Sequence, residues 1–251
     1  MKKLLATFLP ALLLLSACDS GTQAPKATAQ AEAPAAAEAE TLVVETPPII
    51  ERKVLFGNPL RFQGRLSPDG AKMSFRAPLD GVMNIWVGDR GDFDSVKPIT
   101  NDTGRGVPSH FWALDSQHVM YTQDQGGDEN WHLYRVDLAS GETIDLTPFD
   151  GVQAQVIAQS ESKPGVVIVG MNDRDPKWHD VYSVNLATGE RTLLAENNGF
   201  ASILVDNNLE VRMATTPTPS GGLSVSVKDG DAWAPLFEIP FEDVLTTGIL
   251  G

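Results

Sequence analysis

Cysteine, histidine and positive charge are all scarce in this chain. Its 251 residues include one Cys and four His, which excludes an internal disulfide framework and a zinc site built from several cysteines. Only 19 Lys and Arg stand against 33 Asp and Glu, giving a net charge of −14. A nucleic-acid binder needs a basic face, so we expect no nucleic acid among the partners. We expect no metal and no cofactor either.

Long apolar runs are also rare, and the clearest one lies at the N-terminus. Residues 4–15 follow Lys2 and Lys3 and are apolar throughout apart from Thr7 and Pro10. The run is too short to span a bilayer, which takes about 20 residues. A short apolar run behind positive charges is typical of a secretory signal peptide.

The end of this run, Leu15-Ser16-Ala17-Cys18, resembles the cleavage box of bacterial lipoproteins. The resemblance implies removal of signal peptide 1–17 and lipidation of Cys18, with the protein held at the bacterial cell envelope on the periplasmic side. Asp19 resembles an inner-membrane retention signal. The alternative is an ordinary signal peptide with an unrelated cysteine. Residues 18–48, rich in Ala, Pro and Glu, are predicted to be a disordered tether.

Residues 49–251 repeat a pattern of short strands rich in Val, Ile, Leu and aromatic residues. Equivalent third strands contain Trp86, Tyr134, Tyr182 and Val225, at intervals of 48, 48 and 43 residues. Repeats of this length made of strands are the signature of propeller blades. The prediction is an all-β fold, a β-propeller of four-stranded blades with about four blades present in an incomplete ring. A plain antiparallel sandwich is the alternative.

Several strings in this part point to a family. These are Leu66-Ser67-Pro68-Asp69-Gly70, the string from Gly126 to Tyr134 (GGDENWHLY) and the string from Asn172 to Tyr182 (NDRDPKWHDVY). They resemble the N-terminal propeller of the prolyl oligopeptidase family of serine peptidases, on its acylaminoacyl- and dipeptidyl-peptidase-like side. The resemblance implies a C-terminal α/β-hydrolase domain as partner and short peptides as substrates.

The chain differs from that family because it lacks the sequence pattern of the catalytic serine. A nucleophile elbow has the pattern G-x-S-x-G. The nearest string here, Gly222-Leu223-Ser224-Val225-Ser226, lacks the second glycine and falls in a predicted strand. We therefore predict no catalytic residue in this chain, which is interpreted as a propeller truncated before its catalytic domain.

The candidate substrate-binding residues are Asp128, Glu129 and Arg174. They are predicted to lie in equivalent loops between the second and third strands of neighbouring blades, with Asp173, Asp175 and His179 beside Arg174. An acidic loop there could meet the amino terminus of a peptide. The alternative is that these side chains only cap turns.

Two functions are consistent with the sequence. The preferred one is the substrate-gating and scaffolding propeller of a membrane-anchored serine peptidase that acts on short peptides. The alternative is a stand-alone envelope lipoprotein whose propeller binds a protein partner.

Overall fold

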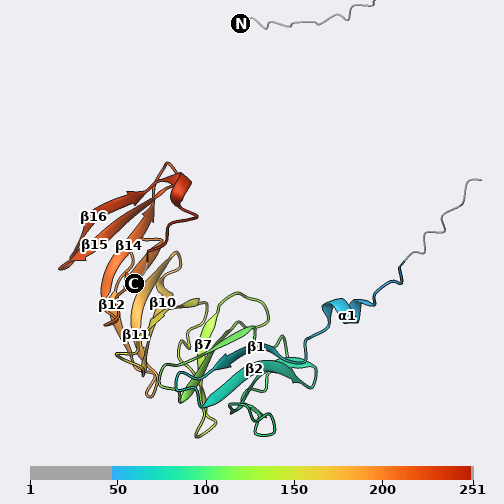
Figure 1. The fold of residues 1–251 in the computed structure, drawn as a ribbon. Helices are drawn as coiled ribbons and strands as arrows, with labels where there is room; N and C mark the ends of the chain where they lie inside the picture. The colour runs from blue at the N-terminus through green and yellow to red at the C-terminus, as the bar shows by residue number, and fades with distance from the viewer. Residues whose placement is uncertain (1–46, 250–251) are drawn as a thin grey trace, which may run out of the picture. The chain divides into compact units, whose positions relative to one another are not determined.

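Sixteen strands in four sheets account for most of the regular structure in the computed structural model, which describes residues 47–249 (Figure 1). Each sheet contains four strands that are consecutive in the chain and antiparallel to their neighbours. The first blade contains β1 (Phe62–Leu66), β2 (Lys72–Leu79), β3 (Val82–Asp89) and β4 (Lys97–Pro98), and the second β5 (Ser109–Trp112), β6 (His118–Gln123), β7 (His132–Asp137) and β8 (Thr143–Asp145). The third contains β9 (Ala154–Gln159), β10 (Val166–Asp175), β11 (Trp178–Asn185) and β12 (Arg191–Ala195), and the fourth β13 (Ser202–Val205), β14 (Val211–Pro217), β15 (Leu223–Asp229) and β16 (Ala232–Ile239).

The helical content is small. One short helix, α1 (Arg52–Phe56), precedes the first blade, and one 3₁₀ turn, η1 (Phe241–Asp243), follows the last. Among the described residues no helix is long and apolar enough to cross a membrane. The predicted signal peptide, Cys18 and nearly all of the tether lie outside the described residues.

The four sheets confirm the predicted blades. Within residues 47–249 no hydrophobic cluster joins the fourth blade to the first, so these four blades form an incomplete ring. The turns also match the sequence. Gly141 and Gly189 have φ of 75° and 72° in the turns after the third strands of the second and third blades, a backbone conformation that glycine adopts without strain.

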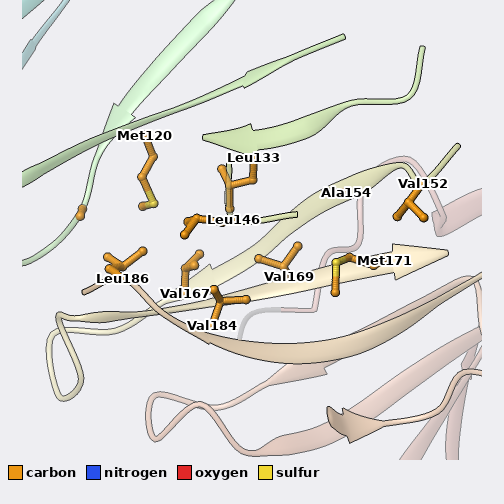
Figure 2. Packing of buried hydrophobic residues seen from close by; sticks show 11 residues of the cluster. Met120, Leu133, Leu146, Val152, Ala154, Val167, Val169, Met171, Val184 and Leu186 are labelled. Carbon is orange, nitrogen blue, oxygen red and sulfur yellow. The ribbon is translucent and has the colours of Figure 1, made fainter. Parts of the chain in front are cut away.

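Apolar side chains join each blade to the next. Met120, Leu133 and Leu146 of the second blade pack against Val167, Val169 and Val184 of the third, as Figure 2 shows. Clusters of the same kind join the first blade to the second and the third to the fourth.

The position of β10 between two blades explains why its sequence is apolar without alternation. Val167, Val169 and Met171 face the second blade, whereas Ile168 lies in the cluster shared with the fourth blade. All four are fully buried. A strand buried on both faces needs an apolar residue at every position.

The outer face of the first blade remains partly open. Leu66 and Phe93 are about half exposed there, and Arg61 stacks between Phe75 and Phe93 with its guanidinium 5.5 and 4.6 Å from the two ring centres. The stacked guanidinium covers Phe75, which is only 7% exposed.

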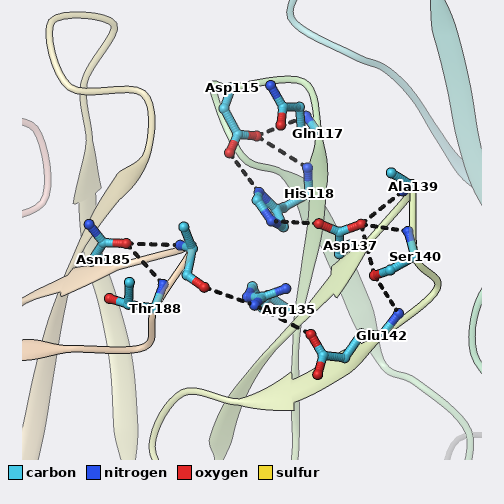
Figure 3. Close-up of polar contacts among 11 residues, drawn as sticks. Asp115, Gln117, His118, Arg135, Asp137, Ala139, Ser140, Glu142, Asn185 and Thr188 are labelled. Atoms are coloured by element: carbon cyan, nitrogen blue, oxygen red, sulfur yellow. Dashed lines mark hydrogen bonds and ion pairs between the residues drawn. The ribbon is translucent and has the colours of Figure 1, made fainter.

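Successive blades define two faces of the body. The loop face carries the connection between the second and third strands of each blade and the linkers between blades, and the turn face carries the other turns. On the turn face His118 lies between Asp115 and Asp137, at 2.6 and 3.4 Å (Figure 3). Nearby, the buried Arg135 donates to the carbonyl oxygen of Ala187 in the third blade (3.3 Å). Polar contacts therefore supplement the apolar packing between blades.

Candidate functional site on the loop face

The β6–β7 loop of the second blade holds two of the three predicted site residues. Asp128 organises the loop, since its carboxylate accepts hydrogen bonds from the N–H groups of Gln125 and Asn130, both at 3.1 Å. Its neighbour Glu129 has a φ of 61°, in the left-handed region, and its side chain is exposed. No side-chain contact is found for Glu129 in the described part of the chain. Its carboxylate is therefore accessible to a ligand, whereas that of Asp128 is already used in the turn.

A buried carboxylate fixes the base of this loop. Arg105, in the linker before the second blade, donates to both carboxylate oxygens of Asp124 at 2.9 and 2.7 Å. The Asp124 side chain is only 5% exposed, and it also accepts the N–H of Glu129 at 3.3 Å. Both bonds come from one nitrogen, Nη1, and both are strengthened by the opposite charges of the two groups. This ion pair holds the loop that presents Glu129.

Arg174 lies in a different setting from the one predicted. The residues Asp173, Arg174 and Asp175 belong to β10, and His179 belongs to β11, so their placement in a loop was wrong. The hairpin continues further than the polar sequence suggests because Arg174 reaches back to Asp180 on β11. Its guanidinium donates to the two carboxylate oxygens of Asp180 at 2.6 and 2.8 Å.

The Arg174–Asp180 pair also holds the linker to the fourth blade. Arg174 donates to the carbonyl oxygen of Asn197 at 2.8 Å, and the N–H of Asn197 donates to Asp180 at 2.6 Å. Desolvation alone would raise the pKa of Asp180, which is 1% exposed, but the hydrogen bonds from Arg174 and Asn197 outweigh it and lower that pKa. The hydrogen bond to Asp180 raises the pKa of Arg174. Arg174 thus has a structural role whether or not it also contacts a ligand.

Equivalent positions in the first and second blades make related contacts. Asn84 at the third strand of the first blade accepts from Thr100 and from the N–H of Asp102 in the following linker, at 2.8 and 2.7 Å. In the second blade His132 pairs at 2.7 Å with Asp145, the last residue of β8, and Asp145 in turn accepts the N–H of Thr147 in the following linker at 2.8 Å. All three residues, Asn84, His132 and Asp180, are buried. We call this contact, made by the buried polar residue at the start of a third strand, a bracket. Its sequence signal is a polar residue directly before the apolar part of that strand.

The loops of the second and third blades lie side by side. Gln153, in the linker between these blades, donates its side-chain amide to the carbonyl oxygen of Glu129 at 3.3 Å. Its backbone N–H donates to the side-chain oxygen of Asn172 on β10 at 2.6 Å. One residue thus bridges the two segments that the sequence singled out. The structure does not join Arg174 to Glu129 or Asp128 by a hydrogen bond.

The buried Ser74–His110 pair has no features of a catalytic dyad. Ser74 lies 2.9 Å from Nε2 of His110, and Nε1 of Trp112 donates to the same hydroxyl at 2.9 Å. Ser74 and His110 are 0% and 1% exposed, so no substrate can reach the hydroxyl. Ser224, the nearest match to a nucleophile elbow, lies in β15 as predicted.

Three aspartates, Asp89, Asp92 and Asp94, lie at the end of β3 and in the turn after it. Asp89 pairs with Lys72 at 2.9 Å, and Asp92 accepts the N–H of Asp94 at 2.9 Å. Across residues 47–249, no group of three or more His, Cys, Asp or Glu side chains is placed to hold a metal ion.

The fold and this face define a four-blade segment of a β-propeller. The chain is 43% identical over 238 residues to dipeptidyl aminopeptidase BIII of Pseudoxanthomonas mexicana, a match that covers 94% of this chain and 34% of that protein. It is 28% identical over 181 residues to dipeptidyl peptidase family member 6 of Caenorhabditis elegans, covering 69% of this chain and 24% of the relative. The resemblance to the propeller part of the prolyl oligopeptidase family, on its dipeptidyl-peptidase-like side, is thereby confirmed.

Structural comparison agrees with the fold. A solved prolyl endopeptidase matches 71% of this chain and 28% of its own, with a TM-score of 0.50 and 14% sequence identity. No family model matches the chain. The chain spans about a third of the length of the bacterial relative and about a quarter of the nematode one.

Proposed function

We propose that this chain is the substrate-gating and scaffolding propeller of a membrane-anchored serine peptidase that acts on short peptides. The observation that carries the proposal is the 43% identity to dipeptidyl aminopeptidase BIII across 94% of the chain. The hydrolysis itself is assigned to an α/β-hydrolase domain outside these 251 residues. The propeller contributes a loop face that admits peptides, with Glu129 as the accessible carboxylate.

The chain alone should not react with a fluorophosphonate probe, because its sequence has no G-x-S-x-G nucleophile elbow. The experiment compares residues 18–251 with a longer product of the same gene that continues past Gly251. We expect one labelled serine in the longer product, together with release of dipeptides from a chromogenic peptide substrate. Labelling of a serine within residues 18–251 would contradict the assignment. A stop codon directly after Gly251 would favour the stand-alone, partner-binding lipoprotein.

The anchor is tested at Cys18. If the cysteine is lipidated, mass spectrometry of the mature protein will find an acylated Cys18 as its first residue. The Cys18→Ala variant should accumulate as uncleaved precursor and lose the acyl mass. An unmodified N-terminus at another position in the wild type would rule out a lipid anchor while leaving the peptidase assignment intact.

Glu129 is tested in the longer, active product. If its carboxylate meets the amino terminus of a peptide, Glu129→Gln should raise KM about 3- to 10-fold for peptides with a free amino group, as expected for loss of one ion pair in partial contact with water. Peptides with an acetylated terminus should be unaffected. Glu190→Gln, an equal charge change on the exposed turn face, is the matched control. An equal effect on both kinds of peptide would show that Glu129 does not select the amino terminus.

A further inference from the structure

A hollow of about 660 Å³ opens between the first and second blades, and neither Glu129 nor Arg174 lines it. Its wall combines the β2–β3 turn, the linker after β4 and the face of β6, and it includes Asp80, Asp102, Tyr121 and Gln123. This volume lies in the range of small-molecule sites. The hollow is therefore large enough for a ligand of amino-acid size.

Tyr121 contributes an unpaired polar group to this wall. The residue is only 7% exposed, and its ring stacks on Tyr134 with the ring centres 5.0 Å apart. Its hydroxyl has no hydrogen-bond partner among residues 47–249 and is not fully buried, so it is open to the hollow that the side chain lines. Since the side chain lines the hollow, a molecule inside can supply the missing partner. Burial, with Tyr134, Asp102 and Asp145 nearby, raises the pKa of Tyr121 to about 12, so the phenol is neutral at physiological pH.

The charges around the hollow are negative. Asp102 uses Oδ2 to accept the N–H groups of Gly104 and Gly106, and no contact is found for Oδ1 in the described part of the chain. Asp80 lies exposed at the β2–β3 turn, with a φ of 51°. None of the residues lining the hollow is Lys, Arg or His.

Two of the cations around the hollow are engaged elsewhere, and a third, Lys97, is exposed on β4 next to the lining residue Pro98. Arg76 donates to the carbonyl oxygen of Val107 at 2.7 Å, behind the wall, and Arg105 is paired with Asp124. An anionic ligand would face two carboxylates and no basic residue in the wall itself, whereas a cation would find acceptors and opposite charge together.

We propose that this hollow binds an organic cation of amino-acid size, whose primary ammonium or guanidinium group donates to Asp102 and to the hydroxyl of Tyr121. Asp80 adds a second negative charge at the mouth. The proposal stands independently of the peptidase function, because the hollow shares no residue with the Glu129 loop and requires no catalytic domain.

The test titrates the mature chain, residues 18–251, with N-acetyl-lysine amide and with uncharged N-acetyl-norleucine amide of similar shape, followed by calorimetry and NMR. We expect saturable one-to-one binding of the lysine probe and at least 10-fold weaker binding of the norleucine probe. Higher salt should weaken the lysine probe, since part of the attraction is between partly exposed charges. Putrescine is added as a third probe. If it binds more tightly than the lysine amide, the natural ligand is assigned as a free diamine, and if it binds more weakly, the ligand is assigned as a peptide side chain. Both outcomes support the cation site.

Three variants locate the binding. Tyr121→Phe keeps the ring stack and removes only the hydroxyl, and Asp80→Asn removes charge at a turn whose left-handed backbone asparagine also tolerates. Each should weaken the lysine probe about 3- to 10-fold. Asp231→Asn, an equal charge change at an exposed turn of the fourth blade, should leave it unchanged. Equal affinity for the lysine and norleucine probes, or wild-type affinity in Asp80→Asn, would overturn the proposal even if Tyr121→Phe failed to fold.

Discussion

Replacing Asp180 by alanine is expected to lower the free energy of unfolding by about 3 kcal/mol, at the lower end of what loss of one partner costs in a buried ion pair. The lower end applies because the Arg174 side chain is 37% exposed, so solvent screens part of the attraction. The substitution removes the acceptor of three hydrogen bonds at once, two from Arg174 and one from the N–H of Asn197. It also leaves that N–H buried without a partner, which is costly in itself.

Urea unfolding of residues 18–251 measures this effect. Asp180→Asn keeps one acceptor oxygen and should lose clearly less stability than Asp180→Ala. Asp150→Ala, at an exposed position for which no side-chain contact is found in the described part of the chain, is the matched control and should change stability by no more than about 0.5 kcal/mol. Equal losses for Asp180→Ala and Asp150→Ala would mean that the bracket does not hold the third blade to the linker.

Acidification from pH 7 to pH 4 is expected to cost the fold about 3 kcal/mol through His110 alone. Burial first, and then the charges of Arg65 and Arg76, lower the pKa of His110 from 6.5 to about 4. The unfolded chain therefore takes up the proton at higher pH than the folded chain does. The stabilisation that comes from keeping His110 neutral is fully present above about pH 6.5. It is lost as the pH falls from 6.5 through 4 and then levels off.

The hydrogen bonds around His110 explain why its neutral form is required. Trp112 donates to the Ser74 hydroxyl, which leaves the hydrogen of that hydroxyl to be donated to Nε2 of His110. The remaining hydrogen of the neutral ring then lies on Nδ1, a buried atom without a partner in the described part of the chain. A second ring proton would abolish the bond from Ser74 and place a charge beside two arginines.

The measurement is a series of unfolding curves between pH 7.5 and pH 4.5 for the wild type and for His110→Gln. Glutamine can accept the hydrogen bond from Ser74 but does not titrate. The wild type should lose stability more steeply than the variant over this range, and parallel curves would show that His110 is not responsible. Carboxylates with lowered pKa values, such as Asp69 and Asp206, act at lower pH and equally in both proteins.

The blades could be predicted from the sequence because both of their signals are local. Strand residues recur at intervals of 43–48 positions, and turn residues such as Gly141 and Gly189 recur at the same place in the unit. The end of β10 could not be predicted in this way. Asp173, Arg174 and Asp175 have the polar character of a loop, but contacts across the hairpin, from Arg174 to Asp180 and from the hydroxyl of Tyr182 to Asp173, accompany their place in a strand.

The candidate site was predictable only in part. A carboxylate in a glycine-rich connection marks Glu129 as exposed, and the structure places it on the loop face. The commitment of Arg174 to Asp180 and the hollow beside Tyr121 depend on where the linkers run. Linker paths follow from the packing of two blades against each other, which no single repeat encodes.

The brackets at Asn84, His132 and Asp180 also bear on how such a chain can change in evolution. Each bracket ties a blade to the linker that follows it, directly at Asn84 and Asp180 and through Asp145 at His132, so the blade and its exit segment form one transferable unit. Because these units contact only their neighbours, a duplication or deletion bounded at the linkers would preserve every contact inside the units and disturb a single junction. The number of blades is therefore open to change by recombination, whereas the position of the polar residue at the head of the third strand is not.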